Sequence, residues 1–114
     1  GWALCIGPHV IAGDFASALS STPGLSPEDM TWREMWPYVW FVEHYSHLLQ
    51  GLIIIGIIDN QAAAFEINKQ ATRCPARRML LWRLARAMRR YNFELFVDWR
   101  HRKFLVFPDR FTHV

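Results

Sequence analysis

The spacing of apolar residues along the chain changes between strand-like and helical periods, and this pattern predicts a mixed α/β domain. Two short apolar segments, residues 2–6 and 9–11, are separated by Gly7-Pro8 and have the form of a β-hairpin. The Ser-rich stretch 17–26, which carries Pro23-Gly24, is predicted to be a loop.

A first long helix is predicted after this loop. Thr31-Trp32-Arg33-Glu34 has the form of a capping box, and apolar residues then recur at helical spacing until Gln50-Gly51. This spacing places Glu34 at the start of the core-facing side of the helix. Pro37 conflicts with a regular helix, because proline removes a backbone donor and crowds the preceding turn, so the helix either begins later or is kinked.

The central apolar run, residues 52–58, is too short to cross a bilayer and is typical of a strand covered on both faces. Asp59 follows it directly and would lie at the C-terminal edge of the sheet, where open α/β sheets bind ligands. A short helix is predicted from residue 61 to 69. The alternative is therefore that Asp59 or Asn60 serves only as the N-cap of this helix.

The strongest helical pattern covers residues 76–90. Its apolar side is formed by Leu80, Leu81, Leu84, Ala85, Ala87 and Met88, and its charged side by Arg78, Arg83, Arg86, Arg89 and Arg90. One side is expected to pack and the other to carry charge. A further strand is predicted at 93–99, and Pro108 suits the first turn of a last helix.

Length and composition favour one domain covering residues 1–114, since 114 residues with 52% hydrophobic content can bury a proper core. Two cysteines supply neither a disulfide framework nor a four-ligand zinc site, so a reducing compartment, cytoplasm or nucleus, is expected. No segment resembles a signal peptide or a membrane span, so no membrane partner is expected. Because the chain starts with Gly1 inside an apolar segment, we expect it to be excised from a longer protein.

Positive charge is concentrated in the second half of the chain. The formal net charge is +3, and Arg33 is the only Lys or Arg before Lys69. This asymmetry indicates a polyanionic partner. The arginine side of the 76–90 helix could grip nucleic-acid phosphates or could be a solvated helix face. Trp82 could stack on a base or bury against another part of a parent protein.

Three acids are candidates for one site. Glu34 opens a helix that must pack on the sheet, Asp59 ends the central strand, and Asp109 follows the last predicted strand. Converging carboxylates are ligands that suit Mg²⁺ or Mn²⁺, and a pair of such ions can activate water for in-line attack on a phosphodiester. The ten acids of the chain allow many such triplets, so spacing alone supports this site weakly.

Four sequence segments, in their order, resemble the ribonuclease H domain of retroelement reverse transcriptases. They are Gly1-Trp2-Ala3 in the hairpin, Trp32-Arg33-Glu34-Met35 in the helix, Asp59-Asn60-Gln61-Ala62-Ala63 at the strand end, and Pro108-Asp109-Arg110-Phe111-Thr112 near the C-terminus. The resemblance covers nearly the whole chain. It implies an RNase H-like α/β fold, with a mixed central sheet and helices packed on it.

The resemblance also implies an activity. Glu34, Asp59 and Asp109 would be the catalytic, metal-binding carboxylates of an endonuclease that cuts the RNA strand of RNA/DNA hybrids in Mg²⁺ or Mn²⁺. His101 would be a possible auxiliary residue near product release; its alternative is a solvated loop histidine. We expect Asn60, Arg78, Arg83, Arg86, Arg89 and Arg90 to contact nucleic acid, and the remainder of a reverse transcriptase polyprotein to be a partner.

The family's first acid has no counterpart in this chain, because it would precede Gly1, so the chain as given could be catalytically silent. The alternative function is therefore a catalytically degenerate RNase H-like module with a structural or nucleic-acid-binding role. A third possibility is an unrelated α/β domain that uses Asp59 only to cap a helix.

Overall fold

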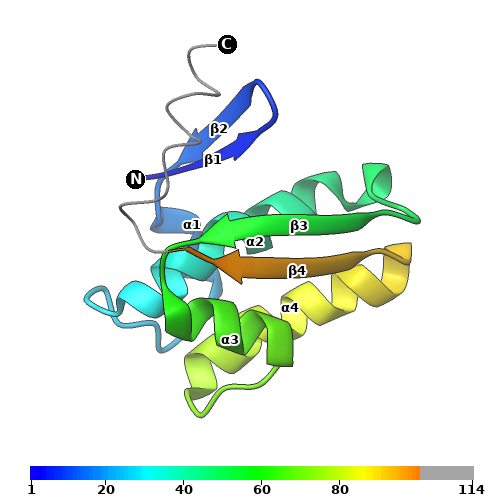
Figure 1. Ribbon diagram of the computed structural model, residues 1–114. Helices are drawn as coiled ribbons and strands as arrows, with labels where there is room; N and C mark the ends of the chain where they lie inside the picture. Colours follow the sequence, from blue (N-terminus) through cyan, green and yellow to red (C-terminus); the bar gives the residue numbers. More distant parts are fainter. Residues whose placement is uncertain (101–114) are drawn as a thin grey trace.

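A computed structural model describes residues 1–100 of the chain (Figure 1). The elements are β1 (Trp2–Ile6), β2 (His9–Gly13), α1 (Ala16–Ser21), α2 (Met30–Tyr45), the short 3-10 helix η1 (Ser46–Leu48), β3 (Ile53–Ile58), α3 (Gln61–Lys69), α4 (Pro75–Tyr91) and β4 (Glu94–Trp99). The expected mixed α/β class is confirmed. His101, Asp109 and the helix predicted at Pro108 lie outside the described residues.

The four strands form two separate pairs. β1 and β2 make the predicted antiparallel hairpin, with Trp2 opposite Gly13 and Ile6 opposite His9. β3 and β4 are parallel, with Ile53 opposite Glu94, and α3 and α4 form the crossover between them. Within residues 1–100, each pair is a two-stranded sheet of its own, so the single mixed central sheet expected from the resemblance is not found there.

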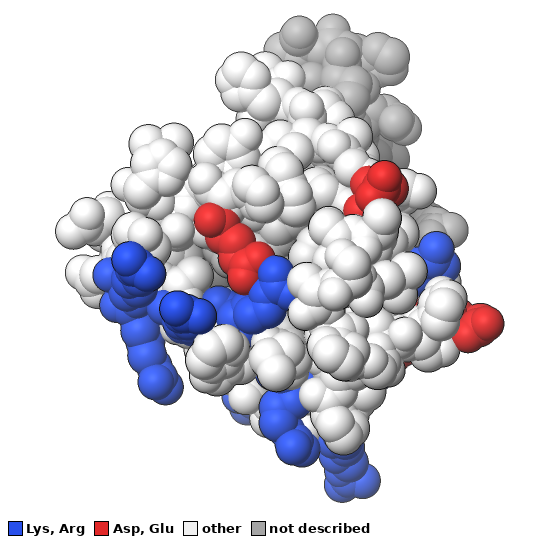
Figure 2. All heavy atoms as spheres, turned by 180° about the vertical axis from the view of Figure 1, so that it is seen from behind, with Lys and Arg blue, Asp and Glu red and all other residues white. Residues whose placement is uncertain are grey.

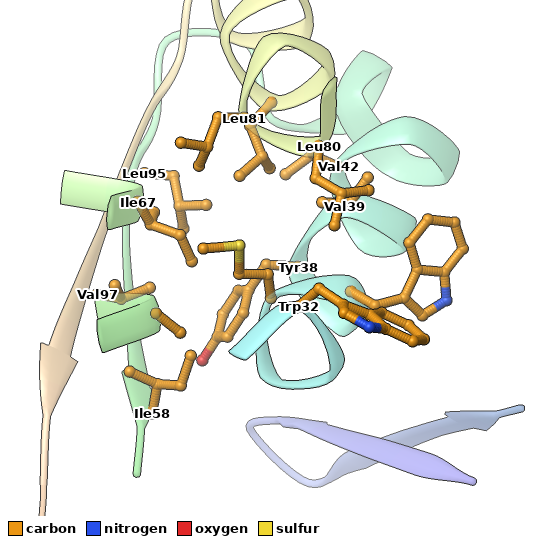
Figure 3. Close-up of a cluster of buried hydrophobic side chains, with 14 of the residues drawn as sticks. Trp32, Tyr38, Val39, Val42, Ile58, Ile67, Leu80, Leu81, Leu95 and Val97 are labelled. Atoms are coloured by element: carbon orange, nitrogen blue, oxygen red, sulfur yellow. The ribbon is translucent and has the colours of Figure 1, made fainter. Parts of the chain in front are cut away.

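The hydrophobic core lies between the β3–β4 pair and helices α2 and α4. Figure 3 shows side chains from both strands and from three helices, α2, α3 and α4, converging on this space. The largest fully buried side chains include Trp32, Trp36 and Met35 of α2 and Leu80 and Leu84 of α4. The predicted apolar side of α4 therefore packs in the core. The predicted side of the first long helix packs only in part, since Tyr38 of α2 is buried but Leu48, which lies in η1, is 64% exposed. Helices α2 and α4 hold the strands from one side.

The expectation that β3 is covered on both faces is wrong for the described part of the chain. Exposure alternates along the strand: Ile53 and Ile55 are 66% and 71% exposed, whereas Ile58 is 3% exposed. Figure 1 shows α2 and α4 behind the two strands, with the front face open. A continuous apolar run indicates that both faces of a strand can be buried. It does not indicate which helices or strands cover each face.

Two local expectations in the first third of the chain are also wrong. The stretch 17–26 contains helix α1 in place of a continuous loop. Helix α2 starts one residue after Asp29, whose side chain accepts a hydrogen bond from the Thr31 N–H at 2.9 Å, so Asp29 is the N-cap and the capping-box reading of Thr31 fails. The helix continues through the buried Pro37.

Two polar side chains fix α3 and α4 in place. Arg77 of α4 forms ion pairs with Asp29 at 2.7 Å and with Glu66 of α3 at 2.8 Å, which ties three helices together. The Asn68 side chain of α3 both donates to the Val97 carbonyl and accepts from the Val97 N–H, at 2.7 and 2.9 Å. Asn68 thereby satisfies the backbone N–H and carbonyl of Val97 on the outer edge of β4, as a neighbouring strand would.

None of the helices in the described region is long and apolar enough to cross a membrane.

Candidate functional site: a carboxylate edge and an arginine face

Asp59 lies where the sequence pattern predicts, directly after β3 and half-buried. The N-cap of α3 is Asn60, whose side-chain oxygen accepts a hydrogen bond from the Ala63 N–H at 2.8 Å. The capping role considered for both residues therefore belongs to Asn60. The Asp59 carbonyl accepts a hydrogen bond from the Trp99 indole at 3.3 Å, which fixes the end of β3 against the end of β4.

Helix α2 brings Glu34 toward the same end of the strand. Only residues 49–52 connect η1 to β3, so the C-terminal end of α2 lies near the start of β3 and its N-terminal end near the end of β3. Tyr38, one helical turn after Glu34, donates its hydroxyl proton to the Ile57 carbonyl at 2.7 Å (its oxygen is visible in Figure 3). The Tyr38–Ile57 contact therefore lies one helical turn from Glu34 along α2 and two residues from Asp59 along the chain.

The environment of Tyr38 shows that this contact is buried and close to Glu34. Burial of the hydroxyl raises the pKa of Tyr38 to about 12, the hydrogen bond to Ile57 opposes this, and the negative charge of Glu34 adds to it. Gly56 makes the approach possible, because a Cβ at this position would lie 2.6 Å from the Tyr38 hydroxyl oxygen. Sequence inspection places Gly56 inside a strand but does not show what approaches it.

Two of the three predicted carboxylates, Glu34 and Asp59, thus belong to elements that meet at the C-terminal end of β3; Asp109 and His101 lie outside the described residues. Among residues 1–100, no group of three His, Cys, Asp or Glu side chains is arranged to hold a metal ion. Both carboxylates are half-buried and supply the hard oxygen donors that Mg²⁺ and Mn²⁺ prefer. The donor chemistry fits such an ion, with further ligands needed from elsewhere.

The predicted arginine face divides into two groups. Arg83 is 17% exposed and pairs with both carboxylate oxygens of Glu43, with the Arg83 Nε at 2.7 Å from one of them. It also donates to the hydroxyls of Ser21 and Thr22 and lies over the Trp36 ring. Arg83 therefore connects α4 to α1 and α2, which gives it a structural role. A helical wheel does not separate such an arginine from its solvated neighbours.

The other predicted arginines, Arg78, Arg86, Arg89 and Arg90, are exposed. Figure 2 shows Lys and Arg side chains along the side of the molecule that α4 occupies. Arg89 and Arg90 lie in the last turn of α4, just before β4 begins beside the start of β3. They are thus at the opposite end of the strands from Asp59, about 20 Å away at roughly 3.3 Å per strand residue.

Comparison of the chain with models of protein families, with curated proteins and with solved structures gives no match. A functional assignment for this α/β domain therefore depends on the chemistry of its own residues.

Proposed function

We propose that this chain is an RNase H-like domain of a retroelement reverse transcriptase, and that it hydrolyses the RNA strand of RNA/DNA hybrids with Mg²⁺ or Mn²⁺. The observation that carries the proposal is that the elements of Glu34 and Asp59 meet at the C-terminal end of β3, where Tyr38 of α2 contacts the Ile57 carbonyl. The element order, a hairpin followed by helices α1 and α2 and then parallel strands β3 and β4 joined by α3 and α4, is compatible with the same family.

Each residue has a definite task in the proposed reaction. Glu34 and Asp59, with Asp109 from the C-terminal segment, would hold the metal ions, which supply an activated water and stabilise the leaving oxygen. Asn60 and Trp99 hold the backbone on both sides of the Asp59 carboxylate, through the cap of α3 and the bond to the Asp59 carbonyl. Tyr38 positions the turn of α2 that carries Glu34, and it is a positioning residue because its hydroxyl is occupied by Ile57.

The test is cleavage of a labelled RNA/DNA hybrid in Mg²⁺ by the chain extended upstream through the segment where the resemblance puts the first acid. We expect cutting of the RNA strand, lost by at least a hundredfold in Asp59→Asn and in Glu34→Gln. Glu43→Gln is the matched control, since Glu43 lies on the same helix as Glu34 but pairs with Arg83. A folded extended chain that binds the hybrid without cutting it would contradict the nuclease.

A second candidate is a degenerate module of the same fold that binds nucleic acid without cutting it. The observation that favours it is the pair of exposed arginines in the last turn of α4, Arg89 and Arg90, which lie at the opposite end of the strands from Asp59. Hybrid binding that is unchanged in Asp59→Asn, together with the absence of cleavage in the extended chain, would support this function.

A further inference from the structure

The C-terminal half of α4 forms a shallow depression of about 410 Å³, lined by Trp82, Ala85, Arg86, Arg89 and Arg90. Three of these five residues are arginines, and none carries a carboxylate. The depression lies on the side of α4 that faces away from the core, since the buried residues of the helix are Leu80, Leu81, Leu84 and Ala87.

Trp82 is the unusual member of this surface. Trp82 is 55% exposed, whereas Trp2, Trp32 and Trp36 are each less than 10% exposed. Trp99 is also partly exposed, at 41%, so exposure alone does not mark a binding site. What distinguishes Trp82 is that arginines surround it in the depression. The Arg86 guanidinium lies over the indole, 5.3 Å from the ring centroid, which places a flat cation beside a flat aromatic surface.

The three arginines of the depression differ from the paired arginines of the same helix. Arg77 and Arg83 form ion pairs with Asp29, Glu66 and Glu43. The ion pairs found within residues 1–100 include none with Arg86, Arg89 or Arg90. Three like charges within five residues repel one another, so an anion bound between them would relieve that repulsion.

A ligand that satisfies both features has a planar aromatic group and more than one negative charge. A nucleotide chain has both, because each base offers a flat face for stacking and each linkage carries a phosphate. In a duplex the bases are stacked on each other, so their faces are closed to an indole on the protein surface. A single strand leaves base faces accessible.

We propose that Trp82, Arg86, Arg89 and Arg90 bind single-stranded nucleic acid, with a base stacked on Trp82 and phosphates held by the arginines. This inference rests on the proposed function in taking the polyanionic partner to be nucleic acid. It adds a second binding surface at the far end of the strands from Asp59, suited to a single-stranded segment that continues from a hybrid.

The test is binding of a fluorescein-labelled twelve-nucleotide oligo-dT to the 114-residue chain, followed by fluorescence anisotropy. We expect Trp82→Ala to weaken binding about tenfold, because the bound base loses its stacking partner. Trp82→Phe should restore most of the affinity. Arg89→Gln should reduce the slope of log K against log salt by about one.

Arg73→Gln is the matched control, since Arg73 is an exposed arginine in the loop before α4 and outside the depression. It should bind within twofold of the unaltered chain. Circular dichroism on every variant separates lost binding from lost folding.

Three outcomes would overturn the inference: unchanged oligo-dT binding by a folded Trp82→Ala variant, equal competition by a blunt RNA/DNA hybrid, or polyphosphate of matched charge competing as well as the oligonucleotide. Asp59→Asn separates the two proposals. If adding Trp82→Ala still weakens oligo-dT binding in the Asp59→Asn variant, the single-strand site is supported. If the extended chain also cuts no hybrid, the nuclease proposal alone is refuted.

Discussion

The contact between Gly56 and Tyr38 offers a sharp test of how α2 is positioned on β3. A methyl group added at Gly56 would meet the distal atoms of the Tyr38 ring: Cε1, the hydroxyl oxygen at 2.6 Å and Cζ at 2.7 Å. Gly56 is not among the glycines with positive φ, so alanine is compatible with its backbone. The whole cost of Gly56→Ala should therefore come from the overlap with Tyr38.

The magnitude follows from two opposing terms. Overpacking in a well-packed core costs about 1–3 kcal/mol, and replacing a strand glycine by alanine returns about 0.5–1 kcal/mol. We expect Gly56→Ala to lower the free energy of unfolding by roughly 1–2 kcal/mol, measured by urea denaturation. In a Tyr38→Leu background, which lacks the contacting atoms, the same change should be neutral or should stabilise by up to about 1 kcal/mol.

The sign reversal between the two backgrounds is the diagnostic result. Ile55→Ala, at a neighbouring position that is 71% exposed, serves as the control and should change stability by less than about 0.5 kcal/mol. An equal cost of Gly56→Ala in both backgrounds would show that Tyr38 does not occupy the space above Gly56, and the placement of Glu34 at the end of β3 would lose its support.

Three further changes test the contacts that hold the site. Arg77→Met should lower the free energy of unfolding by about 2–3 kcal/mol in urea denaturation, because it leaves the largely buried Glu66 without its guanidinium partner. This is somewhat less than the cost of breaking a fully buried ion pair, and a loss below about 0.5 kcal/mol would contradict it. Asn68→Ala should cost about 1–3 kcal/mol and speed amide exchange at Val97, whose N–H loses its acceptor, and unchanged exchange there would refute the edge contact. Tyr38 has a folded-state pKa raised to about 12 from 10.0, so its stabilisation is complete below pH 10 and is lost as pH rises toward 12. Stability of the unaltered chain should therefore fall by about 2–3 kcal/mol over that range, and Tyr38→Phe should remove this component of the decline.

Local sequence patterns predicted most of the described elements because their signals are local. The hairpin follows from two apolar segments around Gly7-Pro8, β3 from a short continuous apolar run, and α4 from its amphipathic helical period. The position of Asp59 follows in the same way, since the end of an apolar run marks the end of a strand. The choice of N-cap was less determined, because Asp29 and Thr31 are both good capping residues. In the structure Asp29 accepts from the Thr31 N–H, and it also pairs with Arg77.

The roles of individual polar residues were decided by tertiary contacts. Arg83 and Arg86 are both on the charged side of α4, yet the position of Glu43 makes one a link between helices and leaves the other beside Trp82. The uncovered face of β3 likewise depends on which elements surround it. By itself, the sequence determined the type of most elements, helix α1 excepted, and the carboxylate at the end of β3, because these follow from neighbours along the chain. Only the tertiary structure decided that Tyr38 joins the turn of Glu34 to that strand end, because this contact bridges residues nineteen positions apart.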